Sequence, residues 1–419
     1  MPDRRSRTAI RFLGLVCLVL SLLAGLLAGC GKIVPTAEPV TISFAHPEPD
    51  AESYQGLVGE FNQRYPYITI ELKPTHWELL GGIADSSGVD VFVNSEFALG
   101  SLRQEGTILD LSPFVEQDAG FALDDLHSGT VNLFTREGKL WAIPSNADML
   151  VMYYNQDLFD QYRVPMPEIG WTWDDFLSIL QGLRDPEADV FGYTPNLQYL
   201  DPLVFVYQHG GRIFDDLLNP TRTTFDEPLT IEALDWYSKL VYEYGLVPTP
   251  EEARELYGSR DDIQNGVYSG KLGMWTGMFS ERGGRFWLGE WKMRWGMVPL
   301  PRDAQAATLT VVEGYFISSE TPHPDACWQW ISFLSQQAPN RGVPVRRSLL
   351  ESTAYAQQVG AEAAAVARAS MESVLLLPPE LAEYGSALEL FGRTFGMIYA
   401  GQATAQEAMA LAQERSPFK

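Results

Sequence analysis

The residues whose spacing first suggests chemistry are three pairs of adjacent aspartates, Asp174-Asp175, Asp215-Asp216 and Asp261-Asp262. Two cooperating carboxylates would form the general acid and base of a glycoside hydrolase. Neighbouring acids on one helix or turn point to different sides, so they are poor acid and base partners. The first pair also follows Thr172 and fits the first turn of a helix. Catalysis is therefore not favoured, and the sequence has no Walker loop, dinucleotide fingerprint or Gly-x-Ser-x-Gly elbow.

Metal-binding and disulfide chemistry are not favoured either. The 5 histidines are scattered, and none lies at i, i+4 from another: His46, His76, His127, His209 and His323. Cys17 lies in an apolar leader, Cys30 ends that leader, and Cys327 stands alone. The sequence therefore predicts no zinc site, no structural disulfide and no cofactor.

The first thirty residues predict export. Arg4, Arg5, Arg7 and Arg11 precede an apolar stretch that ends in Leu27-Ala28-Gly29-Cys30. This is the pattern of a secretory signal peptide over residues 1–29, followed by a tether over residues 30–39. The Leu-Ala-Gly-Cys ending resembles a bacterial lipobox, which implies cleavage before Cys30 and diacylglycerol on its sulfur. The alternative is an uncleaved membrane anchor, and both place the rest of the chain outside the cytoplasmic membrane.

Composition limits the partners. The chain has 419 residues, which suits two or three domains, and 46% of them are hydrophobic, enough for a large core. The formal net charge of −24 disfavours nucleic acid and docking on an anionic membrane surface, because phosphates must be met by clustered Lys and Arg.

The pattern along the chain predicts an α/β fold. Strands are expected at residues 40–45, 68–72 and 89–93, and a helix at 52–65. Asn94 and Glu96 follow the third strand at its carboxyl end, where sheets of this class bind ligands. The alternative for Glu96 is an acid that begins a helix.

Further along, residues 138–176 are the most distinctive stretch. We expect a strand, a loop, a second strand, a short helix and a further helix capped by Thr172. Helical patterns dominate from 176 to about 245, at 324–334 and through most of the last 80 or so residues.

The stretch from Gly138 to Phe176 resembles the extracellular solute-binding proteins of carbohydrate ABC importers. Other stretches fit the same family in order, at residues 61–71, 90–92, 109–114, 210–214, 270–277 and 322–334. The resemblance implies a two-lobe periplasmic-binding-protein fold with a hinge and an interlobe cleft. Its N-terminal lobe would comprise residues 40–147 and 301–334, and its C-terminal lobe residues 148–300 and 335–419.

The resemblance also implies ligand-binding residues. A sugar site needs aromatic platforms and polar groups that take paired hydrogen bonds. Asp148 lies in the predicted loop, where the family commonly places a ligand-binding acid, and Asn146 lies beside it. Phe279 stands where many relatives carry a stacking Trp, and we favour it over Trp275, which fits a strand in the core.

Four further positions complete the expected site. Gly314 and Tyr315 fall where the family's glycine loop brings backbone close to ligand, although Tyr315 is equally consistent with the core. Arg346 matches a Pro-x-Arg pattern often near ligand, its alternative being a surface cation. Tyr199 precedes a turn and helix and is expected to face the cleft.

The resemblance implies a monomeric binding protein without catalysis that delivers a mono- or oligosaccharide to a membrane permease. It would be exported and lipid-anchored to the outer face of the cytoplasmic membrane, or periplasmic. The alternatives are a lipoprotein glycoside hydrolase, a binder of a polyamine or glycerophosphodiester, and a protein that serves a membrane sensor.

Overall fold

The computed structural model describes residues 38–78, 82–83, 88–196, 201–217, 220–258, 263–285, 287, 289–376, 381–416 and 418. Met1–Val40 and Thr41–Lys419 form two separate units, and the fold below is that of the second. The predicted signal peptide, most of the tether with Cys30, and Tyr199 lie outside the described residues. None of the described helices combines the length and apolar character needed to cross a membrane.

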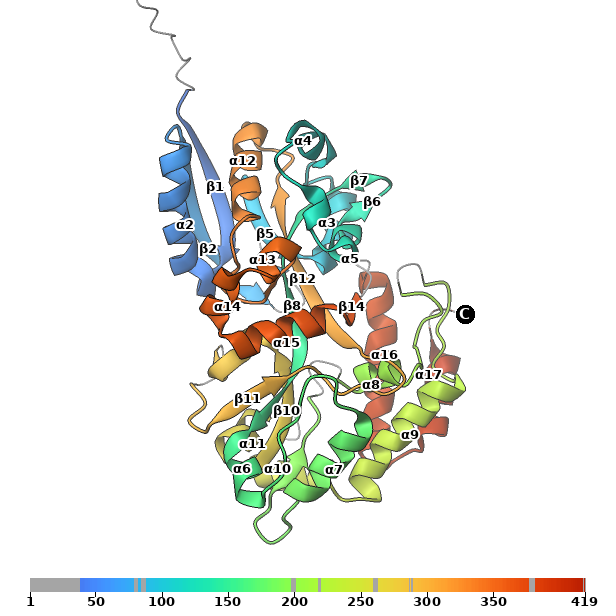
Figure 1. Ribbon diagram of the computed structural model, residues 1–419. Helices are drawn as coiled ribbons and strands as arrows, with labels where there is room; N and C mark the ends of the chain where they lie inside the picture. Colours follow the sequence, from blue (N-terminus) through green and yellow to red (C-terminus); the bar gives the residue numbers. More distant parts are fainter. Residues whose placement is uncertain are drawn as a thin grey trace, which may run out of the picture. The chain divides into compact units, whose positions relative to one another are not determined.

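A mixed sheet positions the site (Figure 1). Seven of its strands follow one another in the order β2-β1-β5-β12-β8-β10-β9. Their bounds are β1 Val40–Pro47, β2 Ile68–Thr75, β5 Val91–Ser95, β8 Ile143–Asn155, β9 Phe191–Tyr193, β10 Leu272–Met278 and β12 Thr308–Ile317. β8 also pairs with β11 and β13, and β12 with β14, at Trp295–Val298, Val343–Pro344 and Val374–Leu376. Two small ribbons pair β3 with β4 and β6 with β7, at Trp77–Glu78, Gly82–Ile83, Thr135–Arg136 and Lys139–Leu140.

β8 is one strand of 13 residues, so the loop predicted between residues 144 and 150 is wrong. Its first half pairs antiparallel with β12 up to Met149, and its second half pairs with β10 from Leu150 onward. The polar side chains that suggested a loop are Asn146 and Asp148, and both find buried hydrogen-bond partners. A polar residue is tolerated in a buried strand when its hydrogen bonds are satisfied in this way.

β5 confirms the strand predicted near residues 89–93; all five of its residues are buried, and it runs parallel to β1. It begins two residues later than expected because Asp90 binds the neighbouring strand with its side chain. Its carboxylate accepts hydrogen bonds from Ser43 N at 2.8 Å and Ser43 Oγ at 2.7 Å. The strand consequently runs to Ser95 and brings Glu96 to its carboxyl end, at the start of a 3₁₀ helix.

Two predicted helices lie side by side against β1 (Figure 1). They are α2, Ala51–Arg64, and α12, Pro324–Leu334. The edge of the Phe61 ring packs on Trp330, with 4.9 Å between the ring centroids. Such aromatic contacts add specific geometry to apolar burial.

The remaining helices cover the sheet, and the last of them form the C-terminal part of the chain. In chain order they are η1 Glu48–Asp50, η2 Glu96–Ala98, α3 Leu99–Glu105, α4 Ser112–Gln117, η3 Leu123–Asp125, α5 Ser128–Leu133, α6 Gln156–Tyr162, α7 Trp173–Leu183, α8 Asp201–Gln208, α9 Pro228–Tyr242, α10 Pro250–Tyr257, α11 Ile263–Tyr268, η5 Phe279–Gly284, α13 Arg347–Leu350, α14 Thr353–Val359, α15 Ala361–Met371, α16 Leu381–Tyr399 and α17 Ala405–Arg415.

The cap predicted for α7 is confirmed. Thr172 Oγ1 accepts from Asp175 N, and the Asp175 carboxylate accepts from Thr172 N at 2.8 Å, which is a capping box. Asp215 accepts from Thr221 N at 2.9 Å and so fixes a turn. The carboxylates of Asp175 and Asp215 therefore accept hydrogen bonds within a helix cap and a turn. The third pair, Asp261-Asp262, lies outside the described residues.

Candidate functional site

Polar side chains gather where three neighbouring strands are in register. Glu313 of β12 pairs with Ser95 at the end of β5 on one side and with Asn146 of β8 on the other. Side chains directly opposite each other on adjacent strands lie on the same face of the sheet. The strand order thus places the carboxyl end of β5 and the middle of β8 on either side of Glu313.

A buried ion-pair network is centred on Arg341, which follows α12. Its Nε donates to Asp50 Oδ2 at 2.6 Å, and its Nη2 lies 2.6 Å from Glu313 Oε1. Asn146 Nδ2 donates to the other Glu313 oxygen at 2.8 Å, and Asn340 Nδ2 donates to Asp50 Oδ1 at 3.0 Å. Burial raises the pKa of Glu313, and the Arg341 charge opposes that rise.

Asp148 of β8 forms hydrogen bonds with Ser280, in the segment that follows β10. Its two carboxylate oxygens accept hydrogen bonds from Ser280 N at 3.0 Å and Ser280 Oγ at 2.5 Å. Burial raises the pKa of Asp148, while the hydrogen bonds from Ser280 and the charges of Arg341 and Arg282 oppose the rise. Asp148 therefore lies in a strand where β8 passes from one group of strands to the other, and not in the predicted loop.

Two aromatic rings lie on the β10 side of Asp148. Phe279 begins η5 and is fully buried, with the Arg282 guanidinium 4.1 Å from its ring centroid. Trp275 is also fully buried and packs against Tyr153 and Trp291, with ring centroids 6.0 Å and 5.0 Å apart. Trp275 is thus a core residue, whereas the guanidinium of Arg282 covers the Phe279 ring.

The two residues predicted at the end of β5 are both buried. Asn94 Oδ1 accepts a hydrogen bond from Ser95 N at 2.9 Å. Glu96 Oε2 accepts one from Val312 N at 2.9 Å, and its Oε1 has no hydrogen-bond partner. Burial raises the pKa of Glu96 well above its usual value, and the nearby Glu313 charge adds to the rise.

Gly314 and Tyr315 are closely packed in β12. A Cβ on Gly314 would lie 3.0 Å from Phe134 Cζ and 3.1 Å from the Ala142 methyl, so a larger residue there would force these neighbours to shift. Tyr315 is buried, and its ring lies 6.4 Å from that of Phe44. Burial raises the pKa of the Tyr315 hydroxyl.

A small pocket borders the ion-pair network and is partly lined by Asp50, Tyr54, Asn146, Tyr315 and Arg341. Its volume is ≈ 20 Å³, which is room for about one water molecule. A larger cavity of ≈ 650 Å³ lies elsewhere, among α4, η3 and α5, and is mainly apolar. The polar network and the larger cavity are therefore separate features.

Sequence reasoning missed His46, at the carboxyl end of β1. Its side chain is fully buried, with Nδ1 2.9 Å from Pro47 O and its ring centroid 4.9 Å from that of Tyr54. Nε2 has no hydrogen-bond partner. The strand-end argument that selected Glu96 applies equally to His46 and would have found it.

Arg346 holds a neighbouring loop and is not a surface cation. Its guanidinium donates to Phe121 O at 2.8 Å, Ala122 O at 3.1 Å and Ser335 O at 2.8 Å, and lies 3.4 Å from the Asp125 carboxylate. The strand-end cluster does not contain it. Because its donors are engaged by the chain itself, we leave Arg346 out of the proposed site.

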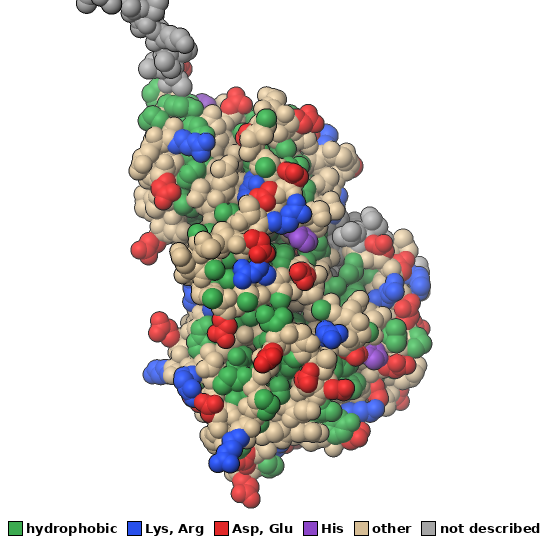
Figure 2. Space-filling view, viewed as in Figure 1, with side chains coloured by type: hydrophobic (Ala, Val, Ile, Leu, Met, Phe, Trp, Pro, Cys, Tyr) green, Lys and Arg blue, Asp and Glu red, His purple; other side chains and the backbone are tan. Residues whose placement is uncertain are grey.

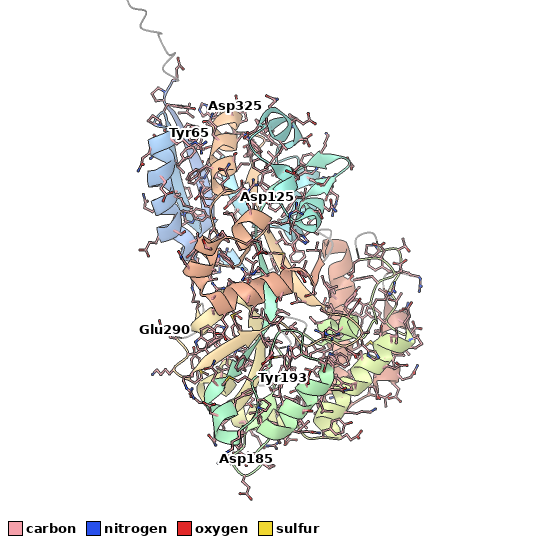
Figure 3. All side chains as sticks on the ribbon, viewed as in Figure 1. Tyr65, Asp125, Asp185, Tyr193, Glu290 and Asp325 are labelled. Carbon is pink, nitrogen blue, oxygen red and sulfur yellow. The ribbon has the colours of Figure 1, made fainter. Side chains whose placement is uncertain are left out.

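A further buried carboxylate, that of Asp201, begins α8. Its Oδ2 accepts from the Tyr193 hydroxyl, from Asn196 N at 2.8 Å and from Thr276 Oγ1 at 3.1 Å. Tyr193 lies at the end of β9 (Figure 3). Burial raises the pKa of Asp201 to about 7. Tyr199, predicted to face the cleft just before this residue, lies outside the described residues.

Two further features bear on nucleic-acid binding and on metal binding. Figure 2 shows Lys, Arg, Asp and Glu side chains interspersed over the face that it presents, without a broad basic area. Among the residues that the structure covers, no group of three or more His, Cys, Asp or Glu side chains could hold a metal ion.

Comparison with known sequences gives a family. A family model described as "Bacterial extracellular solute-binding protein" matches residues 45–340. An arabinooligosaccharide-binding protein of Halalkalibacterium halodurans is 25% identical over 222 residues, which cover 50% of this chain and 48% of that protein. The match therefore spans about half the length of that relative. An uncharacterized lipoprotein of Streptomyces antibioticus is 23% identical, over 76% of this chain and 72% of its own length.

Comparison with solved structures gives the same fold. An ABC substrate-binding protein of Listeria monocytogenes in complex with cycloalternan superposes with a TM-score of 0.73 at 20% identity. The superposition covers 90% of this chain and 98% of that one. The predicted α/β fold of two-lobe solute-binding proteins is thereby confirmed.

Proposed function

Because the chain belongs to the bacterial extracellular solute-binding protein family, we propose that it captures a saccharide for an ABC importer and passes it unchanged to a membrane permease. The observation that carries this proposal is the buried polar cluster where β5, β8 and β12 meet beside η5. Asn146, Asp148 and Glu313 supply amide and carboxylate groups there, and Phe279 supplies a ring.

These groups match the chemistry of a sugar. Vicinal hydroxyls donate pairs of hydrogen bonds that carboxylates accept, and the apolar face of a pyranose packs on an aromatic ring. The Arg282 guanidinium over Phe279 would move aside to expose that ring. The names of the arabinooligosaccharide-binding relative and of the cycloalternan complex support the same class of ligand.

Closure of two lobes would bring these groups onto the ligand. We place the lobes at residues 40–147 with 301–334, and at 148–300 with 335–419. β8 changes its partner from β12 to β10 between Met149 and Leu150, which supports a crossing at this point. A ligand that contacts both sides of such a crossing stabilises the closed state by its differential contacts.

The proposed role does not include catalysis. Asp175 caps α7 and Asp215 fixes a turn, so neither carboxylate is placed as a general acid or base. The saccharide should be recovered intact, as mass spectrometry after prolonged incubation would show. A cleaved product would favour the glycoside hydrolase instead.

Asp148→Asn tests the site. Asparagine keeps the size of the side chain but removes the charge and one acceptor, so we expect the dissociation constant to rise about tenfold or more. Isothermal titration with the saccharide that stabilises the protein most in a thermal-shift screen would measure it. Asp235→Asn, on the exposed side of α9, is the matched control and should leave the constant unchanged. Equal constants in all three proteins would refute the site.

The proposed anchor has its own test. We expect Cys30→Ser to move the protein from the membrane fraction to the soluble extracytoplasmic fraction, because the serine cannot carry the diacylglycerol. Cell fractionation and the mass of the mature N-terminus would measure this. The lipoprotein relative supports the proposal. Retention of the variant in the membrane would favour the uncleaved anchor.

A further inference from the structure

We propose that the permease docks on the loop between α6 and α7, through an extracytoplasmic segment that carries an apolar side chain beside a Lys or Arg. The loop follows Tyr162, the last residue of α6, and ends before Trp173, the first residue of α7. This inference rests on the proposed function, because it names the surface that meets the partner proposed there. None of the residues proposed to bind the saccharide lies in this loop.

The loop exposes large apolar side chains beside a groove. Ile169 is 53% exposed, the highest value among the large hydrophobic residues that the structure describes, and Met166 is 38% exposed. Both line a groove of ≈ 450 Å³, together with Pro165 and the buried residues Trp171 and Ile179. An exposed isoleucine gains free energy when a partner buries it, and apolar grooves with polar borders mark interaction sites. The groove is therefore suited to receive an apolar side chain.

The charged residues that line this groove are both acidic. They are Glu168 and Asp175, and Asp174 is exposed next to Asp175. Arg302 contacts the loop without lining the groove, and its Nε donates to Gly170 O at 3.2 Å. A Lys or Arg beside the inserted apolar side chain would complement these carboxylates. The net charge of −24 attracts a basic partner in the same way.

The same charges argue against other occupants of the groove. A symmetric contact between two copies of this chain would bring Glu168 and Asp175 of one copy close to the same acids of the other. An anionic membrane surface would also be repelled by them. A basic segment of the permease meets neither obstacle.

Hydrogen bonds fasten the loop to the segment that leads from β11 to β12. Trp171 Nε1 donates to Pro299 O at 2.7 Å, and Arg302 N donates to Trp171 O at 3.0 Å. Trp173 N in turn donates to Arg302 O at 3.0 Å. In the proposed lobe division the chain passes from one lobe to the other between residues 300 and 301. A partner on the loop is thus held beside a part of the chain that must adjust when the lobes close.

Saccharide uptake tests this surface in cells that lack their own copy and express the full chain or its variants. The probe is the labelled saccharide that stabilises the protein most in the thermal-shift screen. Ile169→Ser removes an apolar side chain from the contact, so we expect uptake to fall about tenfold. Glu168→Lys would repel a basic partner and should also lower uptake severalfold. The dissociation constant for the saccharide, measured by isothermal titration, should stay unchanged in both variants.

Two variants on α9 are matched controls. Leu229→Ser removes a side chain that is 44% exposed, and Glu243→Lys reverses an exposed charge after the last turn. Both should leave uptake unchanged. Normal uptake in both loop variants, or a weaker saccharide affinity in them, would overturn this inference and leave the proposed function intact. An unmodified protein that bound the saccharide but supported no uptake would refute the proposed function, and this inference with it.

Photo-crosslinking identifies the partner directly. The photoreactive residue p-benzoylphenylalanine would replace Ile169 in the full chain, and illumination of the cells would be followed by mass spectrometry of the adducts. We expect an adduct with a membrane-spanning permease subunit, and no such adduct when the same residue replaces Leu229. An adduct with a second copy of this chain, or the absence of any adduct at position 169, would overturn the assignment of this surface to the permease.

Discussion

Replacing Arg341 with methionine is expected to lower the free energy of unfolding by about 3–5 kcal/mol, because removing one partner of a buried ion pair leaves the other charges uncompensated. Here two carboxylates lose their partner, Asp50 and Glu313, and both are almost fully buried. Methionine fills a similar volume, so the loss would report electrostatics more than packing. Urea unfolding followed by circular dichroism would measure it.

Two further variants separate this effect from general damage. Arg393→Met removes an exposed guanidinium that pairs with Glu389 one turn away on α16, and should change stability by less than about 0.5 kcal/mol. Adding Glu313→Gln to Arg341→Met removes one of the unpaired charges, so we expect about 1–2 kcal/mol to be regained. If Arg341→Met were no more harmful than Arg393→Met, the network would not be a source of stability.

The sequence predicted the elements whose patterns are local. α2 and α12 show apolar residues at helical spacing, and β5 is a short apolar run, so their existence followed from periodicity alone. The prediction for the centre of β8 was wrong because the polar residues there suggested a loop. Asn146 donates to Glu313 and Asp148 accepts from Ser280, and a local pattern cannot show partners that lie more than a hundred residues away.

The same distinction explains the candidate site. Glu96 was found because the end of a strand is visible in the sequence, and Asp148 was found through resemblance. Arg341 was missed because its role depends on Asp50, which lies 291 positions earlier and meets it only in the folded chain. Arg346 was predicted near ligand, yet its hydrogen bonds to Phe121 and Ala122 could not be read from the Pro-x-Arg pattern.

The buried carboxylates also make the stability of the folded protein depend on pH, and each does so in the same direction. Burial raises the pKa of Glu96, Asp148 and Asp201. An acid whose pKa is raised in the folded state holds its proton more tightly there than in the unfolded chain. The folded protein should therefore lose stability as the pH rises through the interval between the unfolded and folded pKa values.

Asp201 should contribute the clearest part of this dependence. Its pKa rises from 3.8 to about 7, so its contribution is fully present below pH 3.8 and is lost as the pH approaches 7. At 1.36 kcal/mol per unit, the loss amounts to at most about 4 kcal/mol. Asp201→Asn should remove it, since asparagine resembles the protonated acid and keeps an acceptor for Tyr193, Asn196 and Thr276.

Urea unfolding of both proteins between pH 4 and pH 8 would measure this contribution as a difference. The two proteins should be about equally stable at pH 4, and Asp201→Asn should be the more stable at pH 8 by up to about 4 kcal/mol. Taking the difference cancels the dependence that Glu96 and Asp148 add to both proteins. Asp235→Asn, an exposed aspartate of α9, should follow the unmodified protein at every pH. Parallel curves for Asp201→Asn and the unmodified protein would mean that Asp201 is ionised in the folded state across this range, and that Tyr193, Asn196 and Thr276 stabilise its charge enough to offset burial.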